Sequence, residues 1–229
     1  MLIVFLLLNV FLLFTLKGFY FGEGISKESV ENVISVLKLR NVTVKCNIPY
    51  SKKTVGTLSL LRDDPIKTGT IKDFEEQGKI DTSKKDEIEG YIKQKVESLG
   101  FPLSQFHLDT LLADDNGVLH VALYQEYEGS KVFSNFIKAD FKNGLIETLD
   151  YKYQKITGLS GAQEIVPIYR ILLKNSKEIN NLVIRSIDIG FKEHVFEGNI
   201  KEPGDIPVWR IKTEEGQDIF FKAYTGEKL

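Results

Sequence analysis

Cysteine is almost absent from this sequence, since Cys46 is the only one among 229 residues. A single cysteine excludes an internal disulfide and any zinc site built from several cysteines. We interpret Cys46 as a small, partly buried side chain at the end of a strand. Positive charge is not in excess either, because 30 Lys and Arg residues face 32 Asp and Glu residues, for a net charge of -2. Without a basic surface to attract a phosphate backbone, nucleic-acid binding is disfavoured.

Clusters of catalytic or metal-binding side chains are also missing. The three histidines are His107, His120 and His194, and His107 shares one side of an expected strand with Asp109. A metal site needs a third and a fourth ligand at a usual spacing, and none follows. Ser104 lies close to His107 in the sequence, but no nucleophile-elbow motif surrounds it. We therefore expect no metal and no catalytic residue.

Acidic and glycine-rich motifs supply no ligand site. Asp63-Asp64 and the segment 114–117 (Asp-Asp-Asn-Gly) both invite interpretation as a calcium site. The segment 114–117 lacks the loop length and the closing Glu of an EF-hand, so it indicates a hairpin turn instead. Neither usual form of glycine-rich phosphate loop is present. Glu87 and Glu89 fit the polar face of a helix as solvated charges. The sequence thus predicts no cofactor and favours a binding or regulatory role.

A long apolar run opens the sequence. Residues 1–16 carry no charge, and the aromatic residues at 19–21 suit the belt at a membrane interface. A spanning helix needs roughly 20 apolar residues, so we predict a transmembrane anchor at residues 1–21. A cleaved signal peptide and a buried core helix are the alternatives, although a basic n-region and an amphipathic period are both missing.

Two polar residues of this run bear on its topology and its contacts. Lys17 follows the apolar segment, where the positive-inside rule disfavours it if the C-terminal domain lies outside the cell. We therefore expect the natural chain to begin upstream of Met1, with some basic residues there. Asn9, near the middle of the run, either bonds locally or forms a hydrogen bond to a partner's helix.

Helical and strand patterns fill the rest of the chain. Ser26 suits a helix N-cap, and apolar residues at 30, 33, 34 and 37 follow at helical spacing. Residues 41–48 alternate as a strand, with 54–61 as the expected partner. Residues 63–85 have few apolar anchors, which predicts a loop or linker.

A second helix and a four-strand meander come next. Ser83 and Asp86 form a capping-box pattern, and Gly100 with Pro102 ends the helix. Asn-Gly is the strongest short hairpin signal, so we expect a meander packed on this helix. The expected strands are 105–113, 118–127, 131–141 and 145–153, joined at Asn116-Gly117, Glu128-Gly129 and Asn143-Gly144.

The last third of the sequence repeats this plan. Ser160 and Gln163 match another capping box before a helical stripe, while Pro167 implies a kink or a later helix start. A strand through Ile187–Phe191 and a hairpin of 208–211 with 219–221 complete the unit. Trp209 and Phe191 belong either to the core or to an interface, and we expect the core because large aromatic side chains bury most of their area.

These elements predict an α+β fold behind a transmembrane helix. Element order suggests two modules that each combine a helix with an antiparallel sheet. The predicted units are an anchor at 1–21, a helix–hairpin segment and linker at 22–80, a first helix-plus-meander module at 81–157 and a second module at 158–229.

Both ends of the sequence resemble the YycI (WalI) family. The apolar start at 4–13 (VFLLLNVFLL) looks like the membrane helix of that family, and the ending from Pro207 through Gly216 to Glu227 looks like its closing hairpin. The same ending is similar to the last hairpin of PepSY-type modules. With the element order, the resemblance covers most of the chain. It implies a single-pass protein of the cell membrane whose C-terminal domain, with a PepSY-like second module, is extracytoplasmic.

The resemblance also implies a function. YycI proteins are non-enzymatic regulators of the YycF/YycG (WalR/WalK) two-component system of cell-wall metabolism, and their partners are YycH and the sensor histidine kinase YycG. Because that contact runs largely through transmembrane helices, we expect Leu6, Asn9 and Leu13 on one helical face to meet a partner. The alternative is a PepSY-like extracytoplasmic inhibitor or ligand-binding module, whereas a cell-envelope hydrolase lacks candidate residues.

Overall fold

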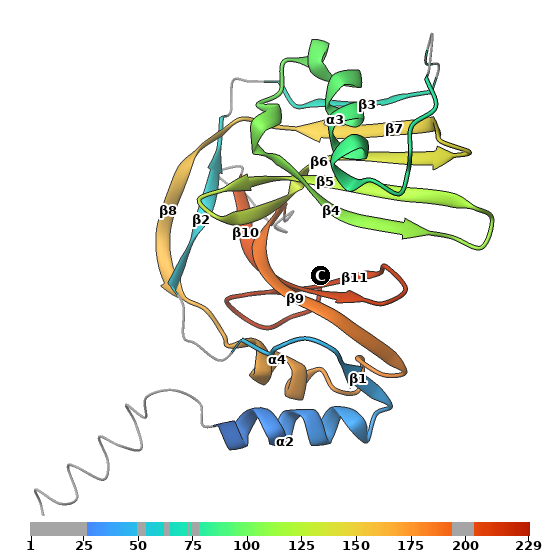
Figure 1. Cartoon of the computed structure of the whole chain (residues 1–229). Coiled ribbons are helices and arrows are strands. Elements are labelled where there is room, and N and C mark those ends of the chain that lie inside the picture. The colour runs from blue at the N-terminus through green and yellow to red at the C-terminus, as the bar shows by residue number, and fades with distance from the viewer. Residues whose placement is uncertain (1–26, 50–53, 62–64, 73, 75–77, 194–203) are drawn as a thin grey trace, which may run out of the picture.

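The computed structural model of the chain describes residues 27–49, 54–61, 65–72, 74, 78–193 and 204–229. This part contains three α-helices and one mixed sheet of eleven strands, so the predicted α+β class is confirmed (Figure 1). The expected anchor at 1–21, with Leu6, Asn9 and Leu13, lies outside the described residues. Among the helices described, none has the length and apolar character needed to cross a membrane.

Strands make up half of the described chain, and the helices are short. The helices are α2 (Lys27–Lys38), α3 (Lys85–Lys95) and α4 (Ile168–Lys174), with 3-10 turns at Glu97–Leu99 and Leu103–Gln105. The strands are β1 (Val42–Val44), β2 (Thr54–Leu60), β3 (Lys67–Ile71), β4 (Phe106–Ala113), β5 (Val118–Tyr127), β6 (Ser130–Lys142), β7 (Leu145–Tyr153), β8 (Ile156–Glu164), β9 (Leu182–Glu193), β10 (Gly204–Thr213) and β11 (Asp218–Lys222).

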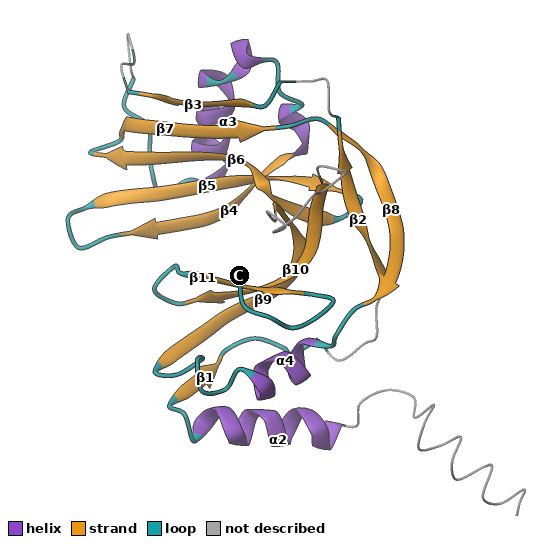
Figure 2. Ribbon diagram, turned by 180° about the vertical axis from the view of Figure 1, so that it is seen from behind, coloured by secondary structure: helices purple, strands orange, loops and turns teal. Residues whose placement is uncertain are grey.

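The strands form two lobes that share one sheet (Figure 1, Figure 2). The first lobe consists of α3 and β3–β7, and the second consists of α2, α4, β1 and β9–β11. Strand β6 of the first lobe pairs in parallel with β9 of the second, where Lys131 lies beside Gly190. Strands β2 and β8 pair with each other along one side of the molecule, and β2 also pairs with β10.

The first lobe is the meander that the turn signals predicted. Strands β4 to β7 pair antiparallel in sequence order, and the turn residues Glu128 and Asn143 have positive φ, as tight hairpins require. Ile88 and Ile92 of α3 are fully buried in a core shared with Leu123. Each such side chain contributes roughly 1.5–3 kcal/mol when it leaves water, which holds the helix on the sheet.

Two details of this lobe correct the prediction. Helix α3 begins at Lys85 rather than near Ser83, and its N-cap receives no side-chain hydrogen bond, so the expected capping box is not formed. Ser83 Oγ has a nearer acceptor and donates to Asp81 Oδ1 at 2.6 Å. Within the expected loop 63–85, residues 67–71 form β3, which pairs with the edge of β7. The backbone hydrogen bonds of β7 stabilise this strand, and the pattern of residues in 67–71 does not predict them.

The second lobe buries its core between two helices and the sheet. Leu37 of α2 and Leu172 of α4 are fully buried in one cluster with Trp209 of β10. Trp209 Nε1 donates to the carbonyl oxygen of Val166 at 2.9 Å, which satisfies the polar end of a buried indole. Trp209 and Phe191 are each 2% exposed, so their expected core positions are confirmed.

Strand pairing in this lobe differs from the prediction in two places. β1 does not pair with β2 but lies parallel to β9, with Val42 beside Leu182. Residues 156–164 form β8, which pairs with β2, so the capping box expected at Ser160 is wrong. Helix α4 starts directly after Pro167, as the alternative of a later start predicted, because proline suits a helix beginning. The hairpin of β10 with β11 is confirmed.

Candidate functional site

Two β-bulges turn charged side chains into the space between the lobes. In β4 the register with β5 shifts between Leu108 and Thr110, which leaves Asp109 as the extra residue. In β9 the register with β10 passes over Arg185 in the same way. A bulge bends its strand and re-aims the extra side chain. Asp109 and Arg185 consequently line the same cleft.

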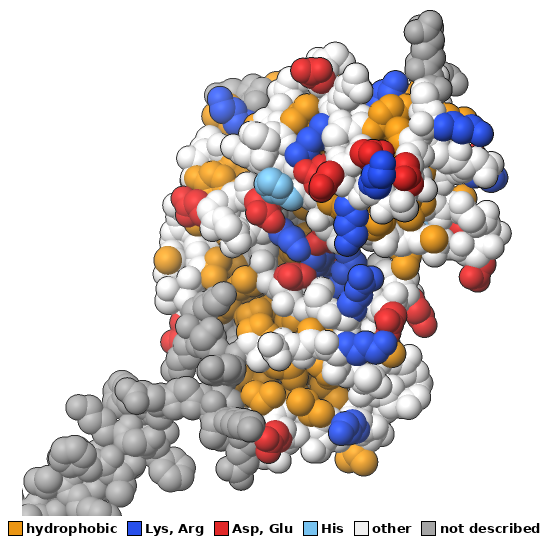
Figure 3. All heavy atoms as spheres, in the orientation of Figure 1, with side chains coloured by type: hydrophobic (Ala, Val, Ile, Leu, Met, Phe, Trp, Pro, Cys, Tyr) orange, Lys and Arg blue, Asp and Glu red, His pale blue; other side chains and the backbone are white. Residues whose placement is uncertain are grey.

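The cleft has a volume of about 490 Å³ and separates β4 from β9 and β10. Figure 3 shows Lys and Arg side chains gathered in the hollow between the lobes. Among the lining residues, four cationic side chains face two carboxylates, although the whole chain has a net charge of -2. The lining consists of Lys85, Leu108, Asp109, Thr110, Leu111, Leu112, Lys131, Arg185, Ser186, Asp188, Lys212 and Gly216.

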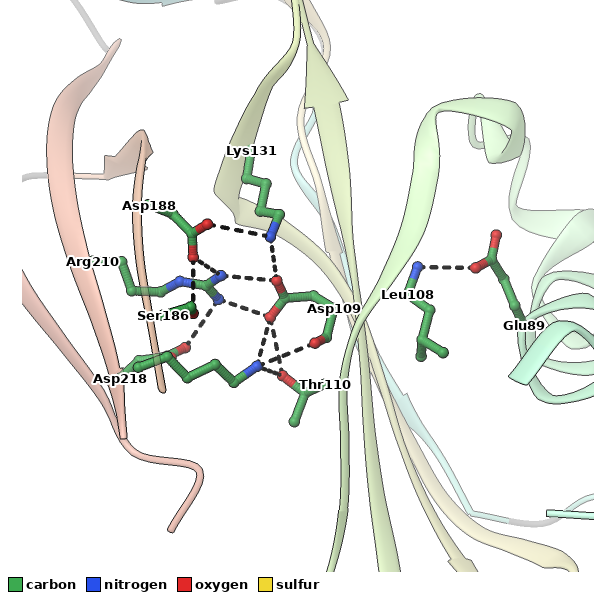
Figure 4. Close-up of polar contacts among 10 residues, drawn as sticks. Glu89, Leu108, Asp109, Thr110, Lys131, Ser186, Asp188, Arg210 and Asp218 are labelled. Carbon is green, nitrogen blue, oxygen red and sulfur yellow. Dashed lines mark hydrogen bonds and ion pairs between the residues drawn. The ribbon is translucent and has the colours of Figure 1, made fainter. Parts of the chain in front are cut away.

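Asp109 is the centre of an ion network between the lobes (Figure 4). The two terminal nitrogens of Arg210 donate to its two carboxylate oxygens, each at 2.8 Å. Lys131 Nζ donates to Asp109 Oδ1 at 2.6 Å, and Lys212 Nζ donates to Oδ2 at 2.9 Å. Arg210 Nη2 also donates to Asp188 Oδ2 at 2.6 Å. Because Asp109 belongs to the first lobe and Arg210 to the second, the network ties the lobes together.

The centre of this network lies out of water. The side chain of Arg210 is 0% exposed and that of Asp109 is 4% exposed. The guanidinium carbon lies 4.6 Å from the centroid of the Phe133 ring, so the cation also stacks on an aromatic face. Burial alone raises the pKa of Asp109, but the hydrogen bonds and charges of Arg210, with the two lysines, hold that pKa well below its usual range. Asp109 therefore stays ionised and offers no proton for acid–base chemistry.

Charges balance inside the network but not around it. The carboxylate of Asp218 lies 3.5 Å from Arg210 Nη1, so three cations share three carboxylates. Lys85 and Arg185 are exposed on the cleft lining and form no ion pair with any residue in the described part of the chain. The excess positive charge of the cleft is thus carried by these two side chains.

Glu89 of α3 fixes β4 from the opposite side. Its carboxylate accepts the backbone N–H of Leu108 at 2.9 Å and Lys93 Nζ at 2.7 Å. Burial raises the pKa of Glu89, but the bonds from Lys93 and Leu108 leave it below the ordinary value. The interpretation of Glu89 as a merely solvated charge is wrong, because its side chain is 24% exposed and joins helix to strand.

The histidines take no part in this site. His107 is exposed, and the bulge directs Asp109 into the ion network, so the pair considered for a metal does not form. His120 Nδ1 lies 2.7 Å from Asp140 Oδ1, on the neighbouring strand. His194 lies outside the described residues. Within the residues that the structure describes, no group of three or more His, Cys, Asp or Glu side chains is placed to hold a metal ion.

Two smaller predictions are confirmed. Asp114 Oδ1 accepts the N–H groups of Asn116 at 2.9 Å and Val118 at 2.8 Å, as expected of a hairpin turn at 114–117. Cys46 is half-buried, two residues after β1 ends, and burial raises the pKa of its thiol. Asp63-Asp64 lies outside the described residues.

Sequence reasoning missed the network because its members come from distant strands. Asp109 and Arg210 are 101 positions apart, and no local pattern links them. One signal was present, since Arg210 and Lys212 interrupt the apolar run that begins at Ile206 in β10. A charged side chain inside a buried strand must find a counter-charge, although the sequence does not identify which residue supplies it.

A family model described as YycI protein matches residues 63–224, which is more than half of the chain. The matched span contains β3 to β11 and therefore both walls of the cleft. No curated protein matches the chain.

Proposed function

Because the chain belongs to the YycI family, we propose that it acts with a YycH-type partner to modulate the sensor histidine kinase YycG (WalK). The family consists of non-enzymatic regulatory proteins of the YycFG two-component system, so this chain is not an enzyme. The match over residues 63–224 is the observation that carries the proposal. The regulated output is cell-wall metabolism, controlled through the response regulator YycF.

The contact with the kinase is assigned to the membrane. Residues 1–21 supply one spanning helix, and Leu6, Asn9 and Leu13 form the face that meets a partner helix. An interhelical hydrogen bond from Asn9 is worth about 0.6–2 kcal/mol in a bilayer. The family is membrane-anchored, which supports this arrangement. The modules at 81–157 and 158–229, the second of them PepSY-like, then form an extracytoplasmic domain.

The described site supports a binding role for that domain. Its central charges hold the two lobes in one arrangement, because Arg210 bridges to Asp109 through two hydrogen bonds. A rigid domain on a membrane helix regulates a kinase if it binds one signalling state better than the other. The shift in kinase population then equals the difference between the two binding free energies.

The proposal is tested in a bacterium that carries the YycFG system and lacks its own YycI protein. The measured quantity is the phosphorylated fraction of YycF, separated by phosphate-affinity electrophoresis. The full chain should restore the level of the parent strain, whereas Leu6→Ala with Asn9→Ala and Leu13→Ala should not.

A matched control carries the same number of alanines on the opposite helical face, at Val4, Leu8 and Phe11. This control should restore phosphorylation as the unmodified chain does. If the unmodified chain leaves the phosphorylated fraction of YycF unchanged, the proposed function is wrong. If both triple variants restore it equally, the assigned helical face is wrong.

A further inference from the structure

The cleft is bordered by the edge of a strand rather than by its face. Five consecutive residues of β4, 108–112, line it, although successive side chains of a strand point in opposite directions. Strand β4 pairs with β5 and with no other strand of the sheet that the structure describes. Its other edge faces the second lobe in both views (Figure 1, Figure 2). An unpaired strand edge is a template for an added strand.

Part of this edge is already occupied, which leaves a defined free segment. Glu89 accepts the N–H of Leu108, and the carbonyl oxygen of Asp109 accepts Lys212 Nζ at 3.2 Å. Lys212 Nζ also donates to Thr110 Oγ1, so the stretch that no other described strand occupies runs from Leu111 to Ala113, the end of β4. Leu111 and Leu112 also border the cleft and offer apolar contact beside the backbone.

The charges of the cleft select the ligand. Lys85 reaches it from the first residue of α3, and Arg185 reaches it from the bulge in β9. Both are exposed and have no ion-pair partner among the described residues, whereas the deeper lysines are engaged with Asp109. Two unpaired cations on opposite walls favour an anionic ligand that passes between them.

We propose that this cleft binds an acidic segment of a partner protein in an extended conformation, paired with the free edge of β4 and facing Lys85 and Arg185. A cavity of about 490 Å³ falls in the range of roughly 300–1,000 Å³ that holds a compact ligand, so it admits a short segment. The backbone edge recognises a peptide, and the two cations select carboxylates. Binding is a property of this chain alone and does not rest on the proposed action on a kinase.

The probe is a fluorescein-labelled octapeptide of alternating Glu and Val, measured by fluorescence anisotropy with the full chain in detergent micelles. The same peptide with Gln in place of Glu tests the charge requirement. A third peptide, with alternate backbone amides methylated, tests strand pairing, because it cannot donate the hydrogen bonds of a ladder. We expect the first peptide to bind and the other two to bind at least about tenfold more weakly.

Variants of the two unpaired cations test the position of the site. Lys85→Gln and Arg185→Gln should each weaken binding about threefold, and the pair together about tenfold, as expected for partly exposed charge pairs. Lys177→Gln is the matched control, because this exposed lysine follows α4 and does not line the cleft. It should bind the peptide as the unmodified chain does.

Several outcomes overturn the proposal. It fails if the Glu–Val peptide does not bind, or if the Gln peptide binds equally well. Unchanged binding by the double variant places the site elsewhere. Inorganic polyphosphate is the competing probe: if it binds at this cleft and backbone methylation does not weaken the peptide, the cleft recognises polyanions in general rather than a strand.

Discussion

Arg210 of β10 binds Asp109 of β4 through two hydrogen bonds of 2.8 Å and thereby joins the two lobes. The bulge at Asp109 makes this contact possible, because it frees the side chain from the alternation of its strand. The side chain of Arg210 is 0% exposed and that of Asp109 is 4% exposed, so water cannot replace a lost partner of either charge. Removing Asp109 therefore leaves the buried Arg210 with only Asp188 and Asp218 as charged partners.

Asp109→Asn tests this contact. The substitution keeps the size of the side chain but removes the charge opposite Arg210. We expect the free energy of unfolding to fall by about 3–5 kcal/mol, because Arg210 and the two lysines lose the buried carboxylate that they share. Urea denaturation followed by the fluorescence of Trp209, the only tryptophan in the chain, measures the change.

Two further variants make that measurement decisive. Asp115→Asn alters an exposed carboxylate in the adjacent turn and should stay within about 0.5 kcal/mol of the unmodified chain. Asp109→Leu combined with Arg210→Met should lose less stability than Asp109→Asn alone, because the fully buried cation is removed together with its partner. If Asp109→Asn lowers the free energy of unfolding by less than about 1 kcal/mol, the ion network does not stabilise the contact between the lobes.

Gly190→Ala tests the crossing of β6 and β9. A Cβ at this position would meet the carbonyl oxygen of Lys131 and the ring of Phe133. Since a backbone atom cannot move aside cheaply, we expect a loss of about 1–3 kcal/mol in the free energy of unfolding.

A glycine-to-alanine substitution in helix α3 should instead raise the free energy of unfolding. Gly90 lies on the exposed side of α3, and a Cβ there meets nothing within 4 Å. Gly90→Ala should stabilise the protein by about 0.5–1 kcal/mol, because alanine restricts the unfolded chain and favours the helix. Equal effects of the two substitutions in urea denaturation would show that the crossing is not tightly packed.

Asp205 makes the stability depend on pH. This residue of β10 is 1% exposed, and burial raises the pKa of its carboxyl group from 3.8 to about 6. The folded state consequently binds the proton more tightly than the unfolded state. The stabilising contribution of the protonated form is complete below about pH 4 and is lost as the pH rises through about 6.

Asp205→Asn removes this dependence. Near pH 7.5 the variant should exceed the unmodified chain by about 2–3 kcal/mol in the free energy of unfolding, and the advantage should shrink as the pH falls toward 4. Urea denaturation at a series of pH values measures both curves. A constant difference between the two proteins over that range would rule out a raised pKa at Asp205.

The meander of the first lobe was predictable because its determinants are local. The three turns that join β4 to β7 contain Gly117, Gly129 and Gly144, and all three glycines have positive φ. The alternation of apolar and polar residues along each strand determines which face of the sheet is buried, and the apolar face of α3 determines which side of the helix packs on it. None of these features depends on a residue far away in the sequence.

The pairing of β1 and β8 and the composition of the cleft were not predictable in this way. A three-residue strand such as β1 shows no partner preference, and its parallel pairing with β9 depends on contacts about 140 residues away. Ser160 and Gln163 have the residue types of a capping box, but residues 156–164 form β8 and pair antiparallel with β2 instead. The bulges at Asp109 and Arg185 arise from neighbouring strands and leave no mark on their own strand's sequence.

We propose that this chain regulates the sensor kinase through its membrane helix. This proposal is tested most directly by co-purification of YycG with the tagged full chain from membranes, beside a chain whose residues 1–21 are replaced by an unrelated spanning helix. We expect the kinase to be recovered with the native helix and lost with the substitute. Equal recovery with both would place the contact in the part of the chain after residue 21, and no kinase with either would contradict regulation of the kinase by this chain.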